Sequence, residues 1–129
     1  MMSDKFTVEI ISPDQTILKQ ETNEVIIPSF EGQMGILNNH IPLITFLRPG
    51  IITIKAEGEK RFYIEEGTVE FSNNNLLILT STAIDLANLD KNKINELLQT
   101  AEANINTEST DKERYVASYK LETLKEISQ

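Results

Sequence analysis

The sequence predicts a fold in two parts, an all-β sandwich or barrel followed by two antiparallel helices. All four prolines and all five glycines lie before Thr68, so the residues that break regular structure are confined to the first part. Short β-branched and aromatic runs fill that part, whereas after Asp85 the apolar residues recur with a helical period. We therefore expect a β domain over residues 1–86 and a helical hairpin over residues 87–129.

Eight strands are expected in the first part, each bounded by turn residues such as Pro13-Asp14, Pro49-Gly50 and Asn73 to Asn75. Apolar and polar residues alternate within several of them, which is typical of a strand with one buried face. Ile52 and Ile54 alternate with Thr53 and Lys55 in this way. The expected strands are 6–12, 16–21, 24–28, 43–47, 51–56, 61–65, 68–72 and 76–80.

After the β domain, apolar residues with helical spacing form two stripes, one for each expected helix. Asp90 is a suitable N-cap for the first helix, and Thr110 with Glu113 has the spacing of a capping box at the start of the second. The polar stretch 104–109 is expected to form the turn between them. The first stripe is formed by Ile94, Leu97, Leu98, Ala101 and Ile105, and the second by Val116, Tyr119, Thr123 and Ile127.

Composition excludes several classes of function. The net charge is -8 and the basic residues are scattered, which opposes binding to nucleic acid or to an anionic membrane surface. The absence of cysteine excludes disulfides, thiolate catalysis and cysteine-ligated metals. No apolar run approaches the ~20 residues of a membrane span, and the strand pattern begins at once after Lys5. We expect a cytosolic, bacterial protein without a targeting peptide.

No catalytic motif is present, and we expect neither catalytic residues nor a metal site. The single histidine, His40, is insufficient for a multi-histidine metal site, and a serine nucleophile would need it as the base. Glu65 and Glu66 are adjacent, so in a strand their side chains would point to opposite faces. We interpret this pair as part of a solvated edge.

The segment from Ser29 to Gly50 has unusual content, because it combines two close glycines, two prolines, a lone histidine and the apolar Met34. One interpretation is a recognition loop held by a rigid scaffold. The other is a long hairpin connection whose glycines only satisfy positive φ angles. The residues alone do not favour either interpretation.

Three motifs in this segment, 31–37 (EGQMGIL), 40–45 (HIPLIT) and 47–50 (LRPG), resemble the signature of the epsilon subunit of rotary F-type ATP synthases. The resemblance implies a flattened ten-stranded β-sandwich followed by a helix-turn-helix. It also implies a non-catalytic subunit of the central stalk that binds the gamma subunit and the c ring and passes proton-driven rotation to the catalytic head. The implied location is the cytoplasmic face of the bacterial inner membrane, as a peripheral subunit.

The resemblance also implies which residues face the c ring. These are Glu31, Gly32, Gln33 and Met34, which are expected to form one loop. His40 is expected to lie close to this loop. Many members of the family carry an acidic residue at the position of Gln33, which could pair with a basic loop of the ring; glutamine keeps a hydrogen-bonding head but lacks the charge for that ion pair.

The helical hairpin of some family members inhibits the enzyme by extending into the alpha and beta subunits of the head, and in some it binds ATP. The corresponding motif here is 89–94 (LDKNKI), in which Lys93 replaces an arginine that can hold phosphate with a planar fork. We therefore expect no cofactor and no ATP binding, and treat Asp90 and Lys93 as at most a vestigial site. The charges of the second helix are balanced, so we expect the hairpin to stay folded on the sandwich and to regulate weakly.

An alternative from another class is a free-standing β-sandwich that binds a small ligand such as a carbohydrate. Sites of that kind favour exposed aromatic side chains. The chain has no tryptophan and only 6% aromatic residues, which argues against this alternative.

Overall fold

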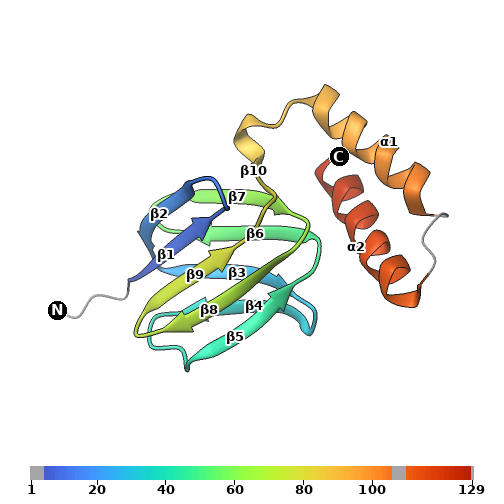
Figure 1. Ribbon diagram of the computed structural model, residues 1–129. Helices are drawn as coiled ribbons and strands as arrows, with labels where there is room; N and C mark the ends of the chain where they lie inside the picture. Colours follow the sequence, from blue (N-terminus) through green and yellow to red (C-terminus); the bar gives the residue numbers. More distant parts are fainter. Residues whose placement is uncertain (1–4, 106–109, 129) are drawn as a thin grey trace.

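The computed structural model describes residues 5–105 and 110–128 and contains ten strands followed by two helices (Figure 1). The two-part fold and the ten-stranded sandwich that the resemblance implied are confirmed. The strands are β1 (Phe6–Ile11), β2 (Thr16–Thr22), β3 (Glu24–Ser29), β4 (Gly32–Leu37), β5 (Leu43–Leu47), β6 (Gly50–Lys55), β7 (Glu59–Ile64), β8 (Gly67–Ser72), β9 (Asn75–Leu79) and β10 (Ala83–Asp85).

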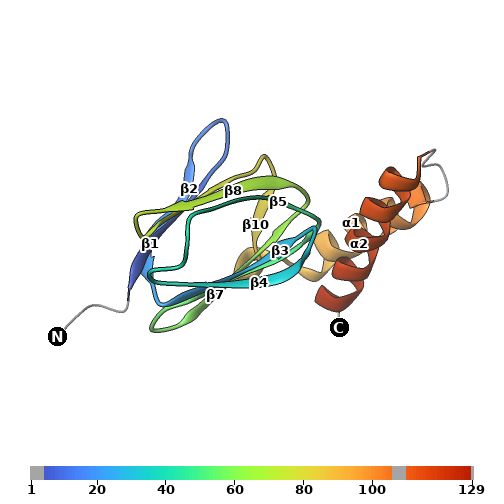
Figure 2. The ribbon, with the colours of Figure 1, turned by 90° about the horizontal axis from the view of Figure 1, so that it is seen from below.

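The strands form two layers that share an apolar core (Figure 2). One layer has the order β10-β7-β6-β3, with β4 paired to the outer side of β3, and the other has the order β5-β8-β9-β1-β2. All pairings are antiparallel except that of β1 with β9. Alternate residues of each strand point into the core, including Val8, Ile10, Ile27, Ile36, Phe71 and Ile78.

Two strands were absent from the sequence prediction. The segment Gly32–Leu37, which the sequence places in a loop, forms β4 and pairs with β3 along its whole length. The short β10 pairs with β7. The eight predicted strands are present, and their predicted ends agree with the observed ones to within two residues.

Turn chemistry explains the tight hairpin connections. Asn73 and Asn74 have φ angles of 51° and 56°, the left-handed values that a two-residue hairpin turn of the primed type requires. Asn39 also has a positive φ, of 65°. Asparagine tolerates this conformation better than other non-glycine residues, so the predicted turn at Asn73 is confirmed.

A 3-10 turn (η1, Leu86–Asn88) leads to the helices α1 (Lys91–Ile105) and α2 (Asp111–Ile127), which run in opposite directions at one end of the sandwich (Figure 1). Both predicted caps are confirmed. The Asp90 carboxylate accepts a hydrogen bond from the Lys93 amide at 2.7 Å, and the Thr110 hydroxyl accepts one from the Glu113 amide at 3.0 Å. Asn104 and Ile105 are helical rather than part of the predicted turn, and residues 106–109 lie outside the described residues.

The helices share a second, smaller apolar cluster with the sandwich. Its buried members are Tyr63 from β7, Ala101 from α1 and Leu124 from α2. Tyr63 therefore connects the sheet to both helices. Neither described helix has the length and the apolar run that a bilayer crossing requires.

Candidate interaction surfaces

The turn between β3 and β4 presents Glu31 to solvent on a well-ordered backbone. The Ser29 hydroxyl donates to the carbonyl of Gly32 at 2.8 Å and accepts from the amide of Glu31 at 3.2 Å. Gly32 has a φ angle of +123°, which only glycine adopts without strain. The Ser29 side chain therefore braces the backbone of this turn, which carries an exposed carboxylate.

Gln33 and Met34 do not form one loop surface with that turn. Because they are successive residues of β4, their side chains point to opposite faces. Met34 packs against the sandwich core. Gln33 is exposed and borders a polar groove of about 270 Å³ beneath α2, together with Arg61 and Glu126. Met34 is therefore half-buried against the core and is not exposed beside Gln33.

The expectation that His40 returns near Glu31 is wrong. Glu31 precedes β4 and His40 follows it, so the two residues lie at opposite ends of a strand about 17 Å long. The His40 ring packs edge-on against Phe71 with a centroid distance of 5.9 Å, and its Nδ1 lies 2.7 Å from the Ile41 carbonyl oxygen. His40 thus belongs to the far end of the sandwich.

Exposed apolar side chains gather in one region of the chain. Among the described residues seven large hydrophobic side chains are exposed, and five of them lie within residues 30–46. They lie on β4, on β5 and in the connections beside these strands, where each sheet ends. We call this set the apolar rim; it consists of Phe30, Leu37, Ile41, Ile44 and Phe46. Contiguous exposed apolar side chains mark contact sites for other proteins, and Phe30 and Phe46 are neighbours here because the Phe30 amide donates to the Phe46 carbonyl at 3.3 Å.

A charged contact joins α2 to the sandwich. The Lys120 ammonium lies 3.0 Å from the Glu65 carboxylate, which also accepts a hydrogen bond from the Tyr63 hydroxyl at 3.0 Å. Burial raises the pKa of Tyr63 well above its usual range, and the adjacent Glu65 charge and hydrogen bond act in the same direction. The phenol therefore stays protonated and remains a hydrogen-bond donor to Glu65.

The interpretation of the glutamate pair as a solvated edge fits Glu66, which is exposed, but not Glu65, which is half-buried. Glu65 contacts Tyr63 and Lys120, while the Glu66 carboxylate accepts a hydrogen bond from the Ser81 amide at 2.9 Å. The two carboxylates occupy the turn between β7 and β8. One anchors the hairpin and the other anchors the connection from β9 to β10.

A second contact joins α2 to the turn between β5 and β6. The Arg48 guanidinium lies 4.1 Å from the centroid of the Tyr119 ring, within the range of a cation–π interaction. The Tyr119 hydroxyl is 2.7 Å from that of Tyr115. The Thr123 hydroxyl lies 3.5 Å from the Pro49 carbonyl oxygen. No local sequence pattern predicts the contacts of Arg48 with Tyr119 and of Pro49 with Thr123, because they join residues far apart in the chain.

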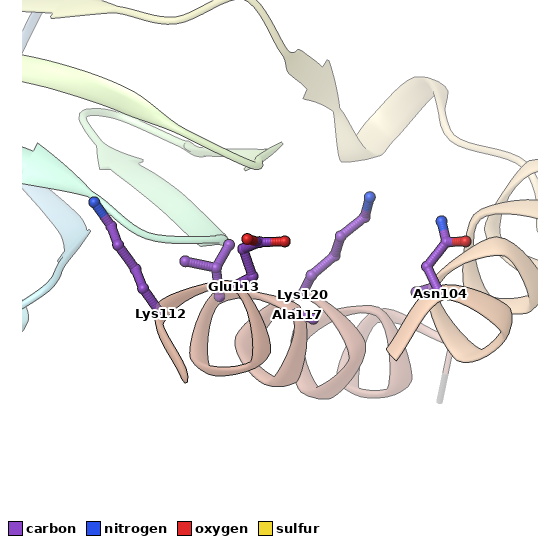
Figure 3. Close-up of a pocket in the computed structure, with 7 residues that line it drawn as sticks. Asn104, Lys112, Glu113, Ala117 and Lys120 are labelled. Carbon is purple, nitrogen blue, oxygen red and sulfur yellow. The ribbon is translucent and has the colours of Figure 1, made fainter. Parts of the chain in front are cut away.

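Asp90 and Lys93 meet only as a helix cap, and both are exposed. The groove between α1 and α2, with a volume of about 310 Å³, lies elsewhere on the hairpin. Lys112, Glu113 and Lys120 project from α2 into this groove, and Asn104 enters it from α1 (Figure 3). The residues treated as a vestigial nucleotide site therefore do not line it.

A ten-stranded sandwich that carries a helical hairpin at one end is the architecture of the ATP synthase delta and epsilon subunits. The family model described as the ATP synthase Delta/Epsilon chain, beta-sandwich domain, matches residues 5–86. The chain belongs to this family. An ATP synthase epsilon chain of Pelagibacter ubique is 46% identical, and the alignment covers 98% of this chain and 100% of that one.

Two solved structures share the fold. One is a chain of the Euglena gracilis mitochondrial ATP synthase, in a structure of its OSCP, F1 and c ring, with a TM-score of 0.75 and 23% identity over 97% of this chain and 80% of that one. The other is a chain of the Tetrahymena thermophila mitochondrial ATP synthase, in a structure of its central stalk and c ring, with a TM-score of 0.71 and 17% identity over the full length of both. None of these similarities supports the alternative of a carbohydrate-binding module.

Proposed function

We propose that this chain is a non-catalytic subunit of the central stalk of a proton-translocating F-type ATP synthase, where it links the gamma subunit to the c ring. The observation that carries the proposal is the position of the apolar rim on a rigid sandwich. Membership of the family supports it, as do the two structural relatives, one from an assembly of OSCP, F1 and c ring and the other from a central stalk with its c ring. The proposed location is the cytoplasmic face of the bacterial inner membrane.

The proposal assigns two surfaces of the chain to two different partners. The turn at Glu31 and Gly32, with the exposed Gln33 beside it, supplies polar groups for the loops of the c ring. The apolar rim supplies the larger contact with the gamma subunit, because buried apolar area stabilises a lasting interface. Met34 supports the turn from inside, and His40 belongs to the rim side of the molecule next to Ile41.

A double substitution tests the contact with the gamma subunit. We expect Ile44→Asp with Phe46→Asp to abolish co-purification with gamma, because two carboxylates would be buried against an apolar partner without cations. Both positions are exposed in the isolated chain, so the fold should persist, which circular dichroism checks. Lys19→Asp on β2 changes the net charge by the same amount and is the control. Normal co-purification of the double variant would contradict the proposed interface.

We also propose that the hairpin stays folded on the sandwich and inhibits ATP hydrolysis weakly or not at all. The contacts of Glu65 with Lys120 and of Arg48 with Tyr119 support the folded arrangement. Because the charges of α2 are balanced, the alpha and beta subunits would attract it only weakly. No nucleotide is part of this proposal, since Asp90 is engaged as a helix cap.

Truncation after Leu89 tests the role of the hairpin. We expect the assembled complex with the truncated chain to hydrolyse ATP at a rate within about twofold of the intact complex, because a weakly docking helix adds little to the barrier. A full-length Lys93→Ala complex serves as the control for changes at the helix start alone. A rise of several-fold on truncation would show that the hairpin inhibits.

A further inference from the structure

The strand β4 is a sheet edge without the usual protection. Among the described strands, β4 and β10 end one layer and β2 and β5 end the other, where β5 meets β3 only at the pair of Leu47 with Ser29. The edge strand β2 carries Lys19 and Glu21 and faces a register shift in β1, while β10 is only three residues long. By contrast, the six residues of β4 include no charge and no proline. Edges of soluble proteins are normally blocked by such features, so an open edge of this length is a pairing site.

The position of Pro28 in β3 shows which backbone amides and carbonyls of β4 point away from β3. Pro28 lies opposite Gln33, and its carbonyl accepts from the Arg48 amide on the side away from β4. In an antiparallel pair the residues that bond to the partner alternate with residues that bond outward. Gln33, Gly35 and Leu37 therefore direct their amides away from β3. The Leu37 carbonyl already accepts from His40, which leaves the amides of all three residues and two carbonyls for a new strand.

The surroundings of this edge favour the approach of another backbone. Gly35 has no side chain, and a Cβ there would meet only the flexible end of Glu24, at 3.1 Å. Leu37 and Ile41 of the apolar rim are exposed beside the edge. A strand added here would gain backbone hydrogen bonds from Gln33 and Gly35 and apolar contacts from the rim.

The acidic side chains near β4 indicate what kind of segment can pair with it. Glu31 stands at one end of β4, and the Glu24 carboxylate lies over its middle, with Lys55 at 4.0 Å as its partner. A second copy of the chain would bring another net charge of -8 against this acidic edge. A segment of opposite charge would be attracted.

We propose that β4 receives an extended segment of another ATP synthase subunit as an added strand, and that this segment has alternating apolar residues and a flanking Lys or Arg. This inference rests on the proposed function for the identity of the complex. The inference goes beyond the proposed function because the partner segment would be recognised by the backbone of Gln33, Gly35 and Leu37 as well as by side chains.

Two variants at one position separate backbone pairing from side-chain contact. Gly35→Pro removes the outward amide and leaves the bonds between β4 and β3, whereas Gly35→Ala adds a Cβ but keeps that amide. We expect the proline variant to be recovered in the purified ATP synthase about tenfold less than the alanine variant, because added strands depend on backbone donors. Equal recovery of the two variants would overturn the proposal.

Amide exchange of the unmodified chain gives a test that does not depend on a variant folding. The amides of Gln33 and Gly35 should exchange rapidly in the isolated chain and slowly in the assembled complex, while Met34 and Ile36 are protected in both. Rapid exchange of Gln33 and Gly35 in the complex would overturn the added strand and leave the proposed function intact. Their protection in a dimer of the isolated chain would assign the edge to a second copy instead. Failure of the unmodified chain to co-purify with gamma would overturn the proposed function itself.

Discussion

Gly67→Ala is expected to lower the free energy of unfolding by roughly 2–3 kcal/mol, the cost of overpacking a filled interior. A Cβ at this position would lie 2.7 Å from the backbone carbonyl oxygen of Leu79 and 3.2 Å from the Leu47 side chain. The carbonyl belongs to the neighbouring strand β9 and has little freedom to move. Chemical denaturation followed by circular dichroism measures the change.

Gly58→Ala is the matched control for that substitution. No atom lies within 4 Å of the position that its Cβ would take. We expect a change within about 0.5 kcal/mol, as is usual for surface substitutions. Similar losses at Gly58 and Gly67 would mean that backbone freedom, and not the close packing of β8 on β9, accounts for the glycine at position 67.

Leu124→Ala is expected to destabilise the docked hairpin by about 3 kcal/mol while leaving the sandwich intact. Leu124 is fully buried in the cluster with Tyr63 and Ala101, which is separate from the core between the sheets. The cavity should therefore loosen the hairpin, including α2, and not the sandwich core. Amide exchange resolved along the chain should show faster exchange in α2 and unchanged exchange in β8.

The exposed neighbour of Leu124 supplies the comparison. Lys125→Ala removes a solvated side chain from the same helix turn and should leave exchange in α2 close to that of the unmodified chain. Equal acceleration of exchange in α2 and β8 by Leu124→Ala would show that hairpin and sandwich unfold as one unit.

The sequence was a good guide to elements with a strong local pattern. Alternation identified strands such as β6 and β8, and hydroxyl and carboxyl caps identified the starts of both helices. It missed β4 because two of its six residues are glycine, and only Ile36 favours a strand by its own shape. Pairing with β3 along its whole length holds β4 in place, and no local pattern of residues records such a pairing.

The candidate surfaces were predicted only where they are local. The projecting turn at Glu31 follows from Gly32 and its neighbours in sequence. The position of His40 was wrong because the intervening residues form a straight strand instead of a loop that returns. The anchors of the hairpin, Glu65 with Lys120 and Arg48 with Tyr119, join distant parts of the chain and have no local signal.

The parallel pairing of β1 with β9 determines when the sandwich is completed during synthesis. Thr7 pairs with Asn75, which lies 68 positions further along the chain. In a nascent chain the hairpin of β1 and β2 is therefore synthesised well before β9, the strand that pairs with β1 in the folded protein. Contacts over such separations slow folding, because a long loop must close before they form. The last layer closes only after Leu79 has left the ribosome, so the N-terminal hairpin is the part that most needs protection from aggregation before then.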